Sequence, residues 1–285
     1  MKEKGYGFKT INNHKRSLKA AFYTAIQDDC IRKNPFDFQL NTVLEDDTEP
    51  KEPLSPTQEA AFLSFVQHDK VYQKYYDEII ILLGTGLRIS EFCGLTIKDI
   101  DMQNHIINID HQLQRTNHME YHIESTKTNA GTRKLPMTDD VYEMFKTILA
   151  NRPKDLPEIM VGGYIGFLFR DKKGMPEVAL HWEQRFKHAV NRYNSIFKVQ
   201  MPKISPHVCR HTYCSNQAKA GMNPKTLQYL MGHSEIGVTM NTYTHLGLDD
   251  AKNEMIRMEE LNQARKEIDK TEGKKPMRQN MFKVV

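Results

Sequence analysis

The sequence predicts an α+β protein, mainly α-helical with a small antiparallel β-sheet, on the basis of three observations. Most segments repeat apolar residues every three or four positions, as amphipathic helices do. Residues 105–136 instead alternate with a period of two, which is typical of strands. Residues 41–54 are acidic, contain prolines and have no period, which indicates an extended linker. We therefore expect a short helical domain (1–44), a linker (45–54), a larger domain (55–247) and a tail (248–285).

Composition limits the classes of function. The 285 residues carry 40 Lys and Arg against 36 Asp and Glu, a net charge of +4, which permits nucleic-acid binding without requiring it. The four cysteines contain no CxxC pair, so we expect no disulfide framework and a reducing cytoplasm. No apolar run approaches the roughly 20 residues that span a bilayer, and no signal peptide opens the chain. We expect no association with a membrane.

Residues 11–30 predict the first helix, with Asn12 or Asn13 as its N-cap. Its apolar positions are Leu18, Ala21, Phe22, Ala25, Ile26 and Cys30. Its outer face carries four basic residues, which either form a solvated face or contact DNA phosphates: His14, Lys15, Arg16 and Lys19. One helix cannot bury its own apolar stripe. We therefore expect this domain to be truncated or to pack on another surface.

The larger domain should begin with a helix that Ser55, Pro56 and Gln58 cap. Its inward residues would be Ala60, Ala61, Phe62 and Phe65. A later apolar run ends at glycines 84 and 86, and Arg88 follows at a helix start beside free backbone amides, which suits an anion. A structural ion pair of Arg88 is the alternative.

The period of two predicts three antiparallel strands, residues 106–109, 121–124 and 133–136. Lys127 would lie in the hairpin turn between the second and third strands, where it either delivers a proton, contacts a phosphate or is merely solvated. Amphipathic helices over residues 138–152 and 181–195 should follow.

Residues 205–246 predict three short helices, because Ser205–Pro206, Asn223–Pro224 and Gly232 with Ser234 are start and stop signals. These helices carry His207, Arg210, His233 and Tyr243. Together with Arg88 and Lys127 they form a set that can act on a phosphodiester. Arginines bind phosphate oxygens in a fork, histidine and lysine transfer protons, and tyrosine can act as a covalent nucleophile.

Two other kinds of chemistry fit less well. The segment offers no carboxylate cluster for Mg²⁺ and no glycine-rich phosphate loop, so neither metal-assisted hydrolysis nor nucleotide hydrolysis is expected. A zinc site is an alternative, although the spacing would place its ligands on different sides of one helix: His207, Cys209, His211 and Cys214.

Five segments in order resemble the tyrosine recombinase (phage-type integrase) family, and most closely the integrases of conjugative transposons of Gram-positive bacteria. They are GTGLRISEFCGL (84–95), the Lys127 segment, HVCRHT (207–212), LMGH (230–233) and NTYTHL (241–246). The resemblance covers residues 55–247, and the first helix is similar to the end of the family's core-binding domain. That domain is usually complete, and Cys209 stands where an aliphatic residue is commoner.

The resemblance implies a catalytic domain that cuts and rejoins DNA through a 3'-phosphotyrosyl link, with no cofactor, metal or ATP. Arg88 and Arg210 would clamp the scissile phosphate, and Tyr243 would attack the phosphorus. Lys127 would protonate the leaving oxygen, His207 would assist the proton loss of the tyrosine, and His233 would donate to the phosphate. Glu91, in support, would orient His207 or a neighbour.

The resemblance also implies partners. We expect the protein to bind double-stranded DNA through the four basic residues of the first helix and through Arg133. We also expect it to act as a tetramer on two duplexes in the bacterial cytoplasm. The tail would dock on a neighbouring protomer or on its own domain, and a directionality factor or DNA-bending protein could assist. The alternatives are a DNA-binding protein of the same fold that does not cut, and an enzyme similar to type IB topoisomerases.

Overall fold

The computed structural model describes residues 1–48, 52–126, 130–243 and 248–271. The chain divides into two compact units, Met1–Lys51 and Glu52–Val285, and we describe each by itself. The α-helices are α1 (Phe8–Gln27), α2 (Pro56–His68), α3 (Tyr76–Thr85), α4 (Ile89–Gly94), α5 (Asp139–Ala150), α6 (Ala179–Ile196), α7 (Pro206–Lys219), α8 (Pro224–Met231), α9 (Ile236–Tyr243) and α10 (Leu248–Thr271). The strands are β1 (Ile100–Asp101), β2 (Ile106–Ile109), β3 (His111–Arg115), β4 (Tyr121–Ser125) and β5 (Arg133–Pro136).

The first unit is built on α1, which starts earlier than the sequence predicted. Its N-cap is Gly7, so the prediction of Asn12 or Asn13 was wrong. The small core consists of Phe8, Ile11 and Leu40. Leu18, which we expected to face inward, is 44% exposed, because the segment after α1 covers the beginning of the helix with Leu40 and leaves most of its apolar stripe without a buried partner.

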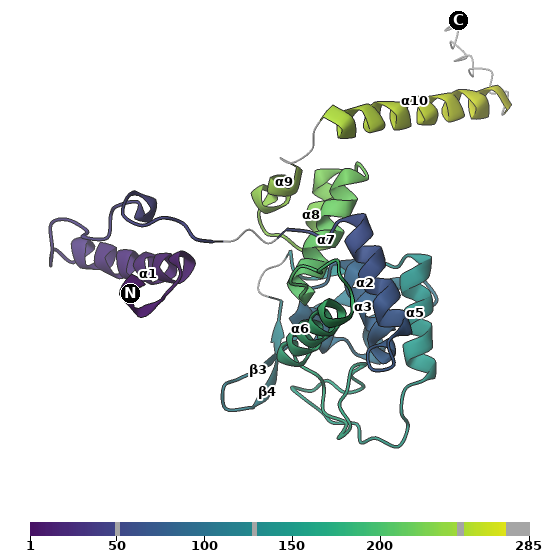
Figure 1. Ribbon diagram of the computed structural model, residues 1–285, viewed down its shortest axis with the longest axis horizontal. Helices are drawn as coiled ribbons and strands as arrows, with labels where there is room; N and C mark the ends of the chain where they lie inside the picture. Colours follow the sequence, from purple (N-terminus) through teal and green to yellow (C-terminus); the bar gives the residue numbers. More distant parts are fainter. Residues whose placement is uncertain (49–51, 127–129, 244–247, 272–285) are drawn as a thin grey trace, which may run out of the picture. The chain divides into compact units, whose positions relative to one another are not determined.

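The second unit packs α2, α3, α5, α6 and α7 around one apolar core, and Figure 1 shows these helices gathered together. Aromatic rings fill its centre: Phe92 stacks on Phe169 with ring centroids 3.9 Å apart, and Trp182 meets Phe92 edge-on at 5.3 Å. The predicted capping box of α2 is present, since the amide of Gln58 donates to the Ser55 hydroxyl and the amide of Ser55 donates to the Gln58 side chain. Phe62 and Phe65 of α2 are buried as expected, whereas Ala60 is exposed.

The break between α3 and α4 positions the first candidate site residue. Gly86 has a φ of +63°, a left-handed conformation that glycine adopts without strain, and it ends α3. Two residues later Arg88 is the N-cap of α4. The expected helix start at Arg88 is therefore confirmed.

The β-structure differs from the predicted single sheet of three strands. Strand β2 pairs with β1 and β5, and β3, which the sequence analysis missed, pairs with β4. Strands β4 and β5 thus belong to different sheets, so the predicted hairpin between them was wrong. Leu113 is the only apolar residue of β3, so the alternation of apolar and polar residues was too weak to indicate a strand there. The predicted fold class, mainly α with small antiparallel β-structure, is confirmed.

The last helices follow the predicted signals closely. Ser205 caps α7 by accepting from the amide of Val208, Asn223 caps α8, and Gly232 ends α8 with a φ of +62°. Helix α9 packs on α7 and α8. Within the described residues, no helix is both long and apolar enough to cross a membrane.

Candidate active site

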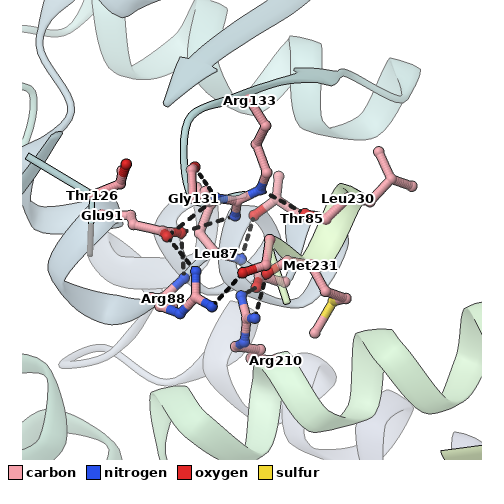
Figure 2. Close-up of polar contacts among 12 residues, drawn as sticks. Thr85, Leu87, Arg88, Glu91, Thr126, Gly131, Arg133, Arg210, Leu230 and Met231 are labelled. Atoms are coloured by element: carbon pink, nitrogen blue, oxygen red, sulfur yellow. Dashed lines mark hydrogen bonds and ion pairs between the residues drawn. The ribbon is translucent and has the colours of Figure 1, made fainter. Parts of the chain in front are cut away.

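Three arginine side chains meet at the carboxyl end of α8 (Figure 2). The carbonyl groups of three consecutive residues at this end each accept a hydrogen bond from one guanidinium group. Leu230 accepts from Arg133 at 2.8 Å, Met231 from Arg210 at 2.5 Å and Gly232 from Arg88 at 2.7 Å. The last carbonyls of a helix have no partners within it and carry partial negative charge, so cations are stabilised there. We call Arg88, Arg133, Arg210 and Glu91 the arginine cluster.

Glu91 holds Arg88 in place within the first turn of α4. The backbone amide of Arg88 donates to one carboxylate oxygen at 3.0 Å, and its guanidinium donates to the other at 2.8 Å. Glu91 is only 2% exposed, whereas the Arg88 side chain is 37% exposed. Arg88 is therefore anchored from inside the protein and open to solvent at the same time.

Arg210 is the buried counterpart of Arg88. It lies on α7, is 7% exposed, and donates to the carbonyl of Gly86 at 2.7 Å in addition to that of Met231. Burial, and then the positive charge of Arg88, lowers the pKa of Arg210 to about 9. The group is still protonated at neutral pH.

Arg133 begins β5, as predicted, but its side chain does not lie at the surface, as its predicted role would require. Its side chain is completely buried and bonds to Glu91, so the structure contradicts our assignment of this residue to direct contact with DNA. A guanidinium with no exposed surface cannot reach a phosphate outside the protein. The sequence did not indicate this burial, since a basic residue after a polar turn is usually solvated.

The cluster carries an excess of positive charge. Burial alone would raise the pKa of Glu91, but the hydrogen bonds and charges of Arg133 and Arg88 outweigh it and hold that pKa below its ordinary value. Glu91 is thus ionised and neutralises one of the three arginines, which leaves an excess of two positive charges. Such an arrangement is suited to an anion with two negative or partly negative oxygens.

His233 follows this carbonyl series directly. Its Nδ1 lies 2.9 Å from the hydroxyl of Thr239. Burial, followed by the charges of Arg210, Arg88 and Arg133, lowers the pKa of His233 to about 4. The imidazole is neutral at physiological pH and can donate only one proton, from one of its two nitrogens.

Tyr243 is the last residue of α9. It is partly buried against a small apolar cluster, separate from the main core, that includes Cys214 and Met231. Its hydroxyl donates to the carbonyl of Met222, so among the described residues its hydrogen bond goes to the backbone before α8 and not to an arginine. Burial, with a smaller effect of Cys214, raises the pKa of the phenol. Tyr243 is therefore a protonated phenol that needs a base to become a nucleophile.

The remaining predicted residues are more scattered. His207 is exposed in the first turn of α7. Lys127 lies outside the described residues, and the hydroxyls of Thr126 and Thr132 on either side of that segment are 2.8 Å apart. In the first unit, Lys15 donates to the carbonyl of Phe38 and Lys19 forms an ion pair with Asp37, whereas His14 and Arg16 are exposed.

One group of described residues has the composition of a metal site, and it lies outside the arginine cluster. Ligand atoms of Asp99, Asp110 and His111 lie within 4.8 Å of one another. Both ring nitrogens of His111 are already hydrogen-bonded, to Asp110 and to the carbonyl of Gly94. The alternative zinc site is not formed, because Cys209 is completely buried while His207 is exposed.

Sequence reasoning missed two features of the site, namely the role of Arg133 and the three carbonyls of residues 230–232. Gly232 was the available signal for the second, because a left-handed glycine after a helix marks the place where unpaired carbonyls gather. No signal in the chain indicated that three arginines from distant segments would bind them.

Comparison with known proteins gives consistent results. Residues 52–248 match the family model described as the phage integrase family. The transposase from transposon Tn916 of Enterococcus faecalis is 52% identical over 263 residues, which are 92% of this chain and 65% of that protein. The chain thus spans slightly less than two thirds of the length of this relative.

Solved structures are also similar. The Tn1549 transposon integrase in complex with circular intermediate DNA is 55% identical, with a TM-score of 0.84 over 90% of this chain and 82% of that one. The same integrase in complex with transposon right end DNA has a TM-score of 0.84, 56% identity and the same coverage of both chains. The XerA recombinase, at 19% identity and a TM-score of 0.54 over 90% of this chain and 78% of that one, shares the fold.

Proposed function

Because the chain belongs to the phage integrase family, we propose that it is a site-specific DNA recombinase that cuts and rejoins DNA through a 3'-phosphotyrosyl intermediate. Its task would be to integrate and excise a mobile element, as the names of its transposon relatives suggest. The substrate would be double-stranded DNA; the similar Tn1549 integrase structures contain circular intermediate DNA and transposon right end DNA.

The excess of two positive charges in the arginine cluster is the observation that carries this proposal. Arg88 and Arg210 donate to adjacent carbonyls, of Gly232 and Met231, so they approach the end of α8 together. A scissile phosphate bound there would have its developing negative charge stabilised by groups fixed before the reaction begins. Such preorganised donors typically contribute several orders of magnitude to the rate.

Tyr243 would supply the nucleophile. Its hydroxyl would release the carbonyl of Met222, approach the phosphorus and lose its proton with the help of His207. The new bond joins the phenolic oxygen to phosphorus, and the bond to the 5'-oxygen breaks, with Lys127 donating the proton that this oxygen takes up. Attack by the 5'-hydroxyl of another strand reverses these steps, so no external energy source is required.

His233 would donate one hydrogen bond to the phosphate. If Nδ1 accepts the hydroxyl proton of Thr239, the single proton of the neutral imidazole is on Nε2, and that nitrogen is free to donate. Of the two expected effects of Glu91, on His207 or on a neighbour, we retain the second: it would act through Arg88 and Arg133, the two arginines that it binds.

Assembly and location are part of the proposal. Four protomers would act on two duplexes, with Arg16 and His14 of α1 contacting phosphates, and a directionality factor or DNA-bending protein would assist. Helix α10 exposes Met255, Ile256, Met258 and Leu261, an apolar set suited to docking on a neighbouring protomer. The protein would work in the bacterial cytoplasm.

One observation favours a second candidate, a protein that binds DNA without cutting it. The hydroxyl of Tyr243 is occupied by the carbonyl of Met222. A phenol that stays there during DNA binding would leave the arginine cluster as a phosphate clamp without a nucleophile.

The test is a suicide DNA substrate incubated with the protein in EDTA, because a nicked product traps the covalent adduct. We expect a protein–DNA adduct in wild type and none in Tyr243→Phe, with the dissociation constant for DNA changed less than about twofold, since the substitution removes a single hydroxyl. Tyr229→Phe is the matched control, because Tyr229 is an exposed tyrosine of α8 whose hydroxyl accepts from the amide of Lys134. Binding without an adduct in wild type would support the second candidate.

A further inference from the structure

Arg133 makes four hydrogen bonds although none of its side-chain surface is exposed. It donates to both oxygens of Glu91, at 2.9 and 3.1 Å, and to the carbonyls of Leu230 and Gly131, each at 2.8 Å. Three parts of the second unit are thereby joined: α4, the end of α8 and the segment that leads into β5. Figure 2 shows the guanidinium between Glu91 and Leu230.

We propose that Arg133 is a positioning residue of the arginine cluster, which fixes Glu91 and the end of α8 so that Arg88 and Arg210 face one phosphate. This inference rests on the proposed function, in which that phosphate is the scissile one. Arg133 itself cannot touch the substrate, because its side chain is buried.

The first reason is charge. Glu91 is shared between Arg88 and Arg133, and a carboxylate that two guanidinium groups share cannot neutralise both of them. With Arg133 removed, the charge of Glu91 would fall on Arg88 alone, and its two oxygens could take both donors of that fork. The cluster would then hold one excess positive charge in place of two, and Arg88 would turn inward.

The second reason is geometry. Arg133 binds the carbonyl of Leu230, and the next two carbonyls are those that Arg210 and Arg88 bind. The three bonds therefore share one short stretch of backbone, and releasing the first would loosen the frame that holds the other two. The fit is close: a Cβ on Gly232 would lie 2.9 Å from Nη1 of Arg133.

A purely structural role is the competing explanation, because a buried ion pair that loses one partner destabilises any protein. The chain offers a matched case in Arg185, which is mostly buried, binds both oxygens of Glu177 and stacks on the rings of Tyr75 and Trp182. Arg185→Lys and Arg133→Lys make the same chemical change, from a planar fork to a point charge, so both variants keep the positive charge and the comparison tests the geometry of the fork.

The experiment compares wild type, Arg133→Lys and Arg185→Lys in three measurements. The first is the single-turnover rate constant of adduct formation at saturating protein, and the second is the dissociation constant for DNA. The third is the dissociation constant for inorganic phosphate in the absence of DNA, determined from the shifts of the proton resonances of the His233 ring. Thermal midpoints report how far each substitution destabilises the fold.

We expect Arg133→Lys to lower the rate constant at least tenfold and to weaken phosphate binding at least tenfold, while its affinity for DNA changes less than about twofold, because contacts outside the cluster dominate that affinity. Arg185→Lys should lower the thermal midpoint similarly and leave both cluster readouts unchanged. Equal losses in the two variants, or no loss in Arg133→Lys, would overturn the positioning role. Should wild type form no adduct, the proposed function fails, and phosphate binding alone decides the role of Arg133.

Discussion

Arg88 and Arg210 carry the same guanidinium group in two different environments. Arg210 is buried, and two backbone carbonyls fix it, those of Gly86 and Met231. Arg88 is held by a carboxylate on one side and is partly exposed on the other. The buried group can set the position of an anion, and the exposed one can close over it. In the proposed reaction one residue type would thus serve two purposes, and burial would distinguish them.

At His233, the lowered pKa predicts how stability depends on pH. The folded protein binds a proton there below about pH 4, whereas the unfolded chain does so below its ordinary pKa of 6.5. Between these values the unfolded state binds more protons, so the contribution of His233 to the free energy of unfolding is full above about pH 6.5 and falls as the pH decreases toward 4. Since one pKa unit is about 1.4 kcal/mol, the whole loss is below about 3.5 kcal/mol, because solvent screens this half-buried group.

Urea unfolding of wild type and His233→Gln at about pH 7.5 and about pH 5 measures this contribution, because the glutamine does not titrate. The difference between the two proteins should shrink at the lower pH. The comparison of wild type with His233→Gln is necessary because a second group titrates in this pH range. Burial raises the pKa of Glu78 to about 7, so the contribution of Glu78 to the free energy of unfolding increases as the pH falls. A difference independent of pH would show that His233 titrates normally in the folded protein.

At the scale of elements, the end of α8 organises the site. A helix of eight residues leaves half of its carbonyls without partners inside it, and here arginines from three other segments satisfy three carbonyls at its end. Gly232 allows the chain to turn at that point with a φ of +62°. The residue after it, His233, is then placed beside the cluster.

Gly232→Ala should therefore harm both stability and reaction. An alanine in the left-handed conformation costs roughly 1–2 kcal/mol, and its Cβ would press on Arg133 at 2.9 Å. Gly163→Ala is the control, because Gly163 also has a positive φ but a Cβ there meets nothing within 4 Å. Urea unfolding should show a larger loss for Gly232→Ala, and adduct formation should slow only in that variant. Equal behaviour of the two variants would contradict the close fit around Arg133.

The same element shows how far the sequence predicts the site. Local signals placed α8, because Asn223, Pro224 and Gly232 act through neighbouring backbone groups. The contacts of Arg133 with Glu91 and Leu230 join segments 42 and 97 residues apart, and no local pattern encodes such pairs. The pairing of β3 with β4 was missed for the related reason that polar Gln112 is buried through side-chain hydrogen bonds. Resemblance to a family supplied the expected roles, and the structure supplied the partners.

At the scale of the whole molecule, basic residues are divided between the two units, and the proposed function gives each unit a different task. The arginine cluster lies entirely in the second unit, Glu52–Val285, while the basic face of α1 belongs to the first. Contacts of the first unit would raise affinity for DNA without entering the chemistry. The net charge of +4 is small, so where the charges lie matters more than their sum.

Salt dependence tests this division. Arg16 is exposed, and within the described part of the chain no side chain pairs with it, whereas Lys19 is already paired with Asp37. We expect Arg16→Gln to reduce the slope of log affinity against log salt by about 0.9, the value for one phosphate contact, and Lys19→Gln to reduce it less. The rate constant of adduct formation at saturating DNA should stay unchanged in both, because the cluster lies in the other unit. A slope unaffected by Arg16→Gln would remove α1 from the DNA interface, and a slower reaction at saturation would mean that the first unit also positions the DNA for cleavage.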